Sequence, residues 1–335
     1  MSEPSAGRAR LPRWAVKAAA GLALALAILL AVELGLRALG PEPHAAVVVS
    51  ADGCYFGWDA LTFERFERPG LAFELSTDAR GLRVEPGAAE PAARCALLAV
   101  GDSFTEGMNV SAAEAWPGAL ERQLASEGYS VRVHNGGMRG HTITHERAAA
   151  LGRWRALEPR VVLVSHTAND LADLHAVDAR CSGDEPATAL EPGVPPLLAR
   201  SRITRVTQDV AARVLRQGPP PALGPAECEA VAERYAAEAR ALIEGVARWG
   251  GRVVFLEPEA FHCGELDASE LRAALRAALE EHGGAYVDAR SALEGTEASL
   301  RPLDSHPSAT GHRRIAAHAA RALLALGALD GCRAR

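Results

Sequence analysis

The feature that most constrains the fold is a regular alternation of short apolar runs with longer amphipathic stretches, which begins near residue 93 of the 335-residue chain. The short runs are typical of buried strands, and the longer stretches have helical periodicity. Strands that alternate with helices of this length form βαβ units, and such units build a parallel sheet covered on both faces. The expected strands are 96–100, 131–134, 160–165, 252–256 and 285–287, and the expected helices are 112–126, 144–157, 227–249, 268–282 and 309–326.

These ten elements predict an α/β domain over residues 93–330, a flavodoxin-like three-layer sandwich with a central parallel five-stranded sheet. Such a sheet has its ligand crevice at the carboxyl ends of its strands. An insertion at 171–226 interrupts the alternation, and within it residues 203–215 have the pattern of one helix. A loop of this length inside a compact domain is typical of a functional lid or a disordered segment.

Residues 14–39 are the most apolar part of the chain, with fifteen consecutive uncharged residues at 18–32. Snorkelling charges at both ends extend this run to about 20 residues, the length of a transmembrane helix. Basic residues dominate the tail at 1–13, so we expect the tail in the cytoplasm. The prediction is a single-pass signal anchor in the inner (cytoplasmic) membrane, with the main domain on the periplasmic or extracellular side. A signal peptide cleaved near Gly40 is the alternative.

Residues 40–92, between the expected anchor and the main domain, are rich in proline and glycine. They contain two strand-like pieces, at 45–50 and 71–75. We therefore expect a spacer and a small β-containing extension that packs on the main domain.

Charge and cysteine content exclude some classes of function. The net charge is −6 with acids and bases interspersed, so no nucleic-acid surface is expected. Six cysteines without a Cys-x-x-Cys sequence favour an oxidising compartment over a zinc or redox site. Cys181 and Cys228 bracket the insertion and are the pair that we expect to form a disulfide. Six buried free thiols are the alternative.

The first strand of the main domain ends in Gly101-Asp102-Ser103, and a helical pattern follows. A serine on such a turn lies at the carboxyl end of the sheet, near helical N–H groups that favour negative charge. Ser103 is therefore a candidate nucleophile. The spacing differs from the Gly-x-Ser-x-Gly elbow, because Thr105 occupies the second glycine position and the next glycine is Gly107. A turn in which Asp102 or Ser103 caps a helix is the purely structural interpretation.

Further polar blocks follow later strands in the same order along the chain. A serine hydroxyl needs a neutral imidazole to take its proton, and the imidazole needs an acceptor on its other nitrogen. Asp304 and His306, just before the last helix, can supply both groups, and Asp288 at the end of the fifth strand is the fallback acid. Gly137 follows the second strand, where only glycine lets the backbone approach a substrate oxygen closely. Asn169 follows the third strand.

The chain resembles the GDSL/SGNH hydrolases over about residues 95–328. The segment 76–83 also resembles the stretch before the serine block in many membrane-anchored bacterial members. One departure is Thr167, which stands where the family usually has glycine. The resemblance rests on four blocks, which are Gly101-Asp102-Ser103, Asn135-Gly136-Gly137, Thr167-Ala168-Asn169-Asp170 and Asp304-Ser305-His306.

The resemblance implies a role for each matching residue. Ser103 is the nucleophile, and His306 with Asp304 completes a catalytic triad. The N–H groups of Ser103 and Gly137 and the side-chain amide of Asn169 line the oxyanion hole. A second departure lies in the triad, because one residue separates Asp304 from His306 where the family usually has two.

The predicted function is therefore a serine hydrolase that cleaves acyl or acetyl esters of a small molecule or glycan through an acyl-enzyme, without a cofactor. An O-acyltransferase acting on cell-envelope glycans is one alternative. A non-catalytic envelope binding protein is another, and the short spacing from Asp304 to His306 favours it. His141 and His145 have the i, i+4 spacing of a helical metal pair beside Glu146, but no third ligand motif follows, so no metal is expected.

Overall fold

The protein is described here by a computed structural model, whose contacts divide the chain into two units. One unit comprises Met1–Pro43 and Val194–Pro220, and the other comprises His44–Gly193 and Pro221–Arg335. The structure describes residues 13–39, 47–50, 54–87, 92–177, 181, 190–192 and 223–334.

The described part of the first unit is the helix α1 (Arg13–Leu39), which matches the apolar segment at 14–39. In the part of the chain that the structure describes, no helix is both long and apolar enough to cross a membrane. The anchor expected at 14–39 stays a prediction. The expected helix at 203–215 lies outside the described residues.

Within the described part of the second unit, eight strands form one mixed sheet, in the order β11-β10-β8-β6-β7-β5-β4-β3. The first five of these strands run parallel to one another. They are the five strands expected from the sequence, and each end differs by at most one residue. The parallel strands are β6 (Cys95–Gly101), β7 (Val131–Asn135), β8 (Val161–Ser165), β10 (Arg252–Glu257) and β11 (Ala285–Asp288).

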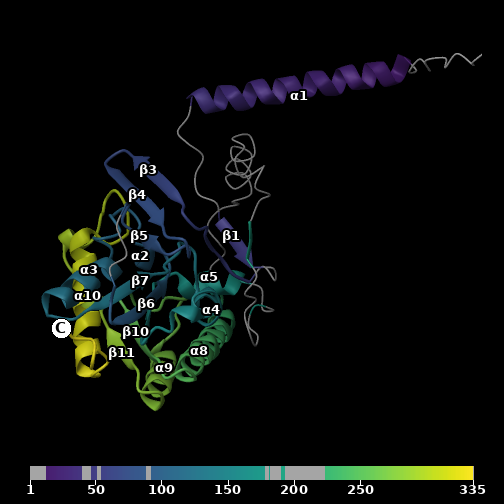
Figure 1. The fold of residues 1–335 in the computed structure, drawn as a ribbon. Coiled ribbons are helices and arrows are strands. Elements are labelled where there is room, and N and C mark those ends of the chain that lie inside the picture. Colours follow the sequence, from purple (N-terminus) through teal and green to yellow (C-terminus); the bar gives the residue numbers. More distant parts are fainter. Residues whose placement is uncertain are drawn as a thin grey trace, which may run out of the picture. The chain divides into compact units, whose positions relative to one another are not determined.

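Helices cover both faces of the parallel strands (Figure 1). On one face, Val162 of the sheet and Tyr235 belong to a core shared with α4, α5, α8 and α9. On the other face, Leu163 and Trp116 belong to a core shared with α3 and α10. Adjacent residues of one strand thus enter opposite cores, which gives the expected three layers. These helices are α3 (Trp116–Ser126), α4 (Ile143–Ala148), α5 (Asp170–Ala176), α8 (Pro225–Ala247), α9 (Ser269–Glu281) and α10 (Ala309–Ala325).

Two helices are shorter than the sequence pattern predicts. The first begins at Trp116 rather than at 112. The helix expected at 144–157 ends at Ala148 and continues as a π turn and a 3-10 turn. Glycine is a weak helix former, and Gly152 lies in the π turn. The short helical elements are α2 (Ser103–Glu106), the π turn Ala149–Arg153, and the 3-10 turns Arg155–Leu157, Arg290–Leu293 and Thr296–Ala298.

The expectation of a purely parallel five-stranded sheet is wrong, because the extension before residue 92 continues the sheet. Its three strands are antiparallel, and β5 joins β7 through the pairing of Arg83 with Asn135. They cover what would otherwise be an open edge of the parallel sheet. The sequence did not predict β3, because Phe63 and Phe66 recur at a spacing of three residues instead of two. The strands are β3 (Phe63–Arg68), β4 (Leu71–Thr77) and β5 (Arg83–Val84).

All six cysteines lie in the described ranges, and all are paired. The expected Cys181–Cys228 bridge and the free-thiol alternative are both wrong. Each bridge joins two segments that only the folded topology brings together. The position of Cys181 and Cys228 around the insertion therefore did not indicate their partners. The bridges are Cys54–Cys181, Cys95–Cys332 and Cys228–Cys263.

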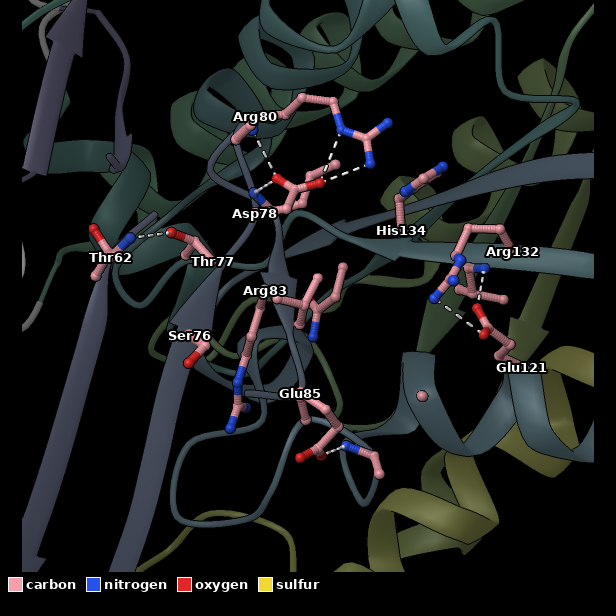
Figure 2. A pocket seen from close by; sticks show the side chains of 18 of the residues that line it. Thr62, Ser76, Thr77, Asp78, Arg80, Arg83, Glu85, Glu121, Arg132 and His134 are labelled. Carbon is pink, nitrogen blue, oxygen red and sulfur yellow. Dashed lines mark hydrogen bonds and ion pairs between the residues drawn. The ribbon is translucent and has the colours of Figure 1, made fainter. Parts of the chain in front are cut away.

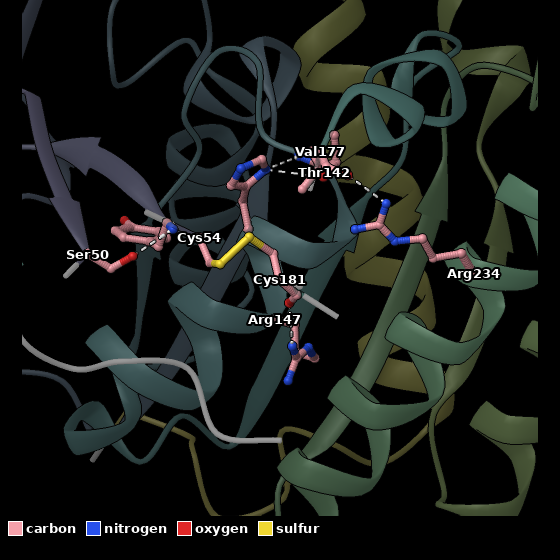
Figure 3. The surroundings of a disulfide bond; sticks show 9 residues. Ser50, Cys54, Thr142, Arg147, Val177, Cys181 and Arg234 are labelled. Atoms are coloured by element: carbon pink, nitrogen blue, oxygen red, sulfur yellow. Dashed lines mark hydrogen bonds between the residues drawn. A yellow bond between two sulfur atoms is a disulfide. The ribbon is translucent and has the colours of Figure 1, made fainter. Parts of the chain in front are cut away.

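The bridge from Cys54 to Cys181 ties the start of the extension to the chain beyond α5 (Figure 3). The guanidinium of Arg147, in the last turn of α4, donates a hydrogen bond to the Cys181 carbonyl at 3.2 Å. The strands of a second, antiparallel sheet begin or end within ten residues of one or the other of these two cysteines along the chain. This sheet consists of β1 (Val47–Ser50), β2 (Phe56–Trp58) and β9 (Leu190–Pro192), in the order β2-β1-β9.

Candidate active site

Ser103 is the first residue of α2, and Asp102 alone separates it from the end of β6. The Asp102 side chain caps this single helical turn by accepting a hydrogen bond from the Phe104 N–H at 2.9 Å. Gly101 has a φ of +156°, and a Cβ there would lie 2.1 Å from Thr105 Oγ1. Glycine is therefore required at the sharp change from strand to helix.

The structure brings Ser103 and His306 together, although they are 203 positions apart in the sequence. Ser103 Oγ lies 2.8 Å from His306 Nε2. On the other side of the ring, His306 Nδ1 contacts a carboxylate oxygen of Asp304. The order of the three groups is that of a nucleophile, a base and an acid that orients the base.

The short spacing from Asp304 to His306 does not prevent their contact. The backbone N–H of His306 donates to Asp304 Oδ1 at 2.9 Å, so a tight turn brings the carboxylate back to the ring. Burial raises the pKa of Asp304, but the hydrogen bonds from His306 outweigh it and the pKa lies below its usual range. The carboxylate is thus ionised at neutral pH. Asp288, the fallback acid, instead pairs with Arg290 on the surface.

Two of the three expected oxyanion donors, Gly137 and Asn169, are engaged with other groups of the protein. The Gly137 N–H donates to Asn135 Oδ1 at 3.0 Å. A Cβ on Gly137 would lie 2.1 Å from Glu106 N, so glycine is needed for close packing against α2. The exposed side chain of Asn169 donates through Nδ2 to Asp173 at 2.5 Å. The described residues include no hydrogen bond from either group to Ser103.

The buried carboxyl group of Asp102 lies behind the serine, and it does more than the helix capping that the sequence pattern indicates. Asp102 Oδ2 is 3.4 Å from Ser103 Oγ and 2.7 Å from Thr167 Oγ1. The same hydroxyl is 3.1 Å from Asp170 Oδ1. One hydroxyl proton cannot serve two carboxylates. Burial, reinforced by the charge of Asp170, raises the pKa of Asp102 to about 7, and burial also raises that of Asp170.

The histidines considered for a metal lie in the core. His141 and His145 stack with their ring centroids 5.3 Å apart, and His145 Nδ1 accepts a hydrogen bond from the Thr142 N–H at 3.1 Å. Burial lowers the pKa of both rings. In the described ranges, no group of three or more His, Cys, Asp or Glu residues is arranged to hold a metal ion. Glu146 is fully buried, and burial raises its pKa.

A cavity of about 670 Å³ lies apart from Ser103, between the extension strands, β7 and α3 (Figure 2). Two ion pairs stand in its wall. Arg80 pairs with Asp78 at 2.7 Å, and Arg132 pairs with Glu121 at 3.3 Å. Ser103, His306 and Asp102 do not line this cavity.

The chain is similar to known proteins in sequence and in structure. Over 85 residues it is 34% identical to Esterase TesA of Pseudomonas aeruginosa, in an alignment that covers 24% of this chain and 40% of that protein. The chain thus spans less than half the length of this curated relative. A crystal structure of TesA, 18% identical, covers 69% of this chain and 99% of its own with a TM-score of 0.42. Axe2, an acetylxylan esterase from Geobacillus stearothermophilus, is 18% identical, with a TM-score of 0.42 and coverage of 72% and 98%.

A family profile gives the broader match. The profile of the GDSL-like lipase/acylhydrolase family matches residues 99–270, just over half of the chain. The matched range begins in β6 and includes the Gly-Asp-Ser turn, the loop after β7 and the loop after β8. The chain therefore belongs to the GDSL-like lipase/acylhydrolase family.

Proposed function

We propose that this protein is a serine hydrolase that cleaves carboxylic esters through an acyl-enzyme. The single observation that carries the proposal is the 2.8 Å contact of Ser103 Oγ with His306 Nε2, combined with the contact of Asp304 at His306 Nδ1. Membership of the GDSL-like lipase/acylhydrolase family supports it. The contact between Asp304 and His306 also removes the main argument for a non-catalytic binding protein.

The proposed reaction has two steps that share one base. His306 Nε2 takes the proton of Ser103 as Oγ attacks the acyl carbonyl carbon, and the tetrahedral intermediate expels the alcohol, which takes that proton. Water then attacks the acyl carbon with His306 again as the base, the bond from that carbon to Ser103 Oγ breaks, and His306 returns the proton to Oγ as the acid leaves. Asp304 holds the ring in place and stabilises its positive charge. The reaction requires no cofactor.

The proposed oxyanion hole consists of the N–H groups of Ser103 and Gly137 and the amide of Asn169. Two of these donors must exchange partners when a substrate binds. The Asn169 amide is exposed and can turn away from Asp173, and the Gly137 N–H must leave the Asn135 side chain. Catalytic hydrogen bonds commonly tighten only in the complex with substrate.

We also propose that the domain works outside the cytoplasm. Three disulfides support this location, because disulfides persist in oxidising compartments. Small acyl groups on envelope glycans are the proposed substrates at such a location, and a longer acyl chain is the other outcome of the test below.

The test is hydrolysis of p-nitrophenyl acetate and p-nitrophenyl octanoate by the purified full chain. Ser103→Ala should lower kcat by more than about 10³-fold. Ser126→Ala, at the exposed end of α3, is the matched control and should keep the rate of the unaltered chain. The ratio of the two rates reports the chain length that the site accepts. An unchanged rate in Ser103→Ala rejects the proposal, and turnover only with an added glycan acceptor would assign a transferase.

A further inference from the structure

Glu106, three residues after Ser103, has a fully buried side chain. Its carboxylate accepts hydrogen bonds from Trp58 Nε1 at 3.2 Å and from the Arg139 guanidinium at 2.8 and 3.0 Å. The Arg139 backbone N–H also donates to it, at 3.2 Å. A buried charge needs partners of this kind. Glu106 therefore ties the turn that carries the serine to the loop after β7.

Arg139 is itself held by the extension. Its guanidinium carbon lies 5.2 Å from the ring centroid of Trp58, 4.7 Å from that of Phe66 and 6.0 Å from that of Phe73. The three rings come from β2, β3 and β4, and Phe66 and Phe73 stack on each other at 4.6 Å. Contacts of a guanidinium with several aromatic faces fix its position as well as its charge. We call these three side chains the aromatic cage.

A second arginine of the extension binds the backbone that follows α2. Arg83 of β5 is buried, and its guanidinium donates to the carbonyl oxygens of Gly107 at 2.7 Å and Val110 at 2.6 Å. It also contacts the carbonyl oxygen of Glu106. Two separate parts of the extension thus reach the residues immediately after the serine turn.

The extension also approaches the loop that carries the acid and the base. A Cβ on Gly70, at the tip of the β3–β4 hairpin, would lie 3.1 Å from Leu303 Cδ1. Leu303 directly precedes Asp304. The hairpin therefore borders this loop as well as the serine turn.

Resting on the proposed function, we propose that Glu106 and Arg139 are positioning residues for Ser103, and that the aromatic cage of the antiparallel extension completes the active site. The helix α2 has only four residues, and a single turn does not hold its own conformation. Its place must come from side-chain contacts, and two residues of α2 make buried ones. Thr105 accepts a hydrogen bond from the Trp116 indole at 3.3 Å, and Glu106 makes those that reach the extension. Glu106 is fully buried and Arg139 is partly exposed. An ion pair with a buried partner contributes little net stability compared with apolar residues of similar volume, whereas it can specify one geometry. The pair thus sets where the serine lies.

The test compares Arg139→Met, Arg139→Lys and the matched control Arg65→Met in the full chain. Arg65 is an exposed arginine of β3 that pairs with Glu67 on the surface. Each variant is assayed for kcat and KM with p-nitrophenyl acetate and for the rate at which a fluorophosphonate probe labels Ser103. Melting temperatures check folding, and amide hydrogen exchange is followed over 103–110 and 136–140.

Arg139→Met should lower kcat and the labelling rate together by about 10- to 100-fold, with KM within about 3-fold, because misplacement by about 1 Å costs about that much. Arg139→Lys keeps a cation in the aromatic cage and should recover part of the loss. Arg65→Met should match the unaltered chain. Exchange in both segments should be faster in Arg139→Met.

A folded Arg139→Met variant with unchanged kcat and unchanged exchange overturns the inference, as does an equal loss in Arg65→Met. If Arg139→Met does not fold, Trp58→Phe removes the indole N–H from Glu106 and keeps an aromatic ring. It should lower kcat by about 3- to 10-fold, and an unchanged kcat in that folded variant rejects the positioning role. If the unaltered chain is neither labelled nor active, the proposed function fails, and the exchange data alone then decide the inference.

Discussion

The two halves of the eight-stranded sheet differ in what they contribute. The parallel half, from β11 to β7, places polar residues after the carboxyl ends of its strands, and Ser103 is among them. The antiparallel half, from β5 to β3, supplies no group in contact with the serine hydroxyl, but it supplies Arg83 and two rings of the aromatic cage. The serine thus follows a strand of the parallel half, whereas side chains that hold its turn in place come from strands of the antiparallel half.

The joint between the halves rests on side chains more than on backbone pairing. The strand β5 has two residues, and one of them, Arg83, pairs with Asn135 of β7. The same arginine then reaches the carbonyl groups behind the serine turn. Arg83 thus couples the extension to the residues after the serine turn in two ways, through its backbone at β7 and through its guanidinium at the Gly107 and Val110 carbonyl groups.

The largest expected effect comes from the parallel half and its loops. His306→Gln removes the base and should lower kcat for p-nitrophenyl acetate by more than about 10³-fold. The melting temperature should change little, because the ring is partly exposed. His262→Gln, in an exposed position after β10, is the control and should keep full activity. Retention of activity in His306→Gln would contradict the assignment of the reacting groups to the parallel half and its loops.

A smaller effect is expected from the joint between the halves. Arg83→Met leaves the carbonyl groups of Gly107 and Val110 without their donor in a buried place. It should lower the free energy of unfolding by about 2 to 4 kcal/mol. Urea unfolding measures it, with Arg65→Met expected within about 0.5 kcal/mol of the unaltered chain. A cost for Arg83→Met as small as that control would show that the extension is not coupled to the serine turn.

Asp102, the buried acid behind the serine in the parallel half, should make the stability of the folded protein depend on pH. The pKa of Asp102 is about 7 in the folded protein, against about 3.9 in an unfolded chain. Between these values the folded state binds more protons, so stability should fall as the pH rises from about 4 to about 7. Above pH 7 this contribution is constant, and below pH 4 it vanishes.

Asp102→Asn should make that slope shallower, because the amide does not titrate. Urea midpoints at about pH 4, 5.5 and 7 measure the slope. Asp330→Asn, at an exposed position after α10, serves as the control and should keep the slope of the unaltered chain. Equal slopes in Asp102→Asn and in the unaltered chain would contradict the assignment.

The smallest effect is expected at the outer edge of the antiparallel half. Phe63 of β3 is 57% exposed, and Phe63→Thr should change the free energy of unfolding by less than about 0.5 kcal/mol. Phe66→Thr in the same strand disrupts the aromatic cage and should lower kcat. If Phe63→Thr and Phe66→Thr have the same kcat, the aromatic cage does not contribute to the activity.

The sequence predicted the parallel half well, because buried parallel strands are short continuous apolar runs. It placed His306 and Asp304 with Ser103 from the groups that a serine nucleophile needs and from the resemblance to the GDSL/SGNH hydrolases, because both residues lie on the loop before α10 and not at the end of a strand. The disulfides depended on contacts between distant segments, such as Cys95 with Cys332, which a sequence alone does not order. The sequence did not single out Glu106 and its partner Arg139, because an acidic residue one turn after a serine is common on an exposed helix surface. Only the extension that covers Glu106 makes it a buried partner.

The acyl-enzyme on Ser103 can be tested by rapid mixing of the full chain with p-nitrophenyl acetate, with the reaction quenched within one turnover. Peptide mass analysis then locates any acetyl group. We expect a burst of p-nitrophenol equal to the enzyme concentration and an acetyl group on Ser103, both absent in Ser103→Ala. Turnover at the same rate with no acyl group on Ser103, or with the group on another residue, would contradict it.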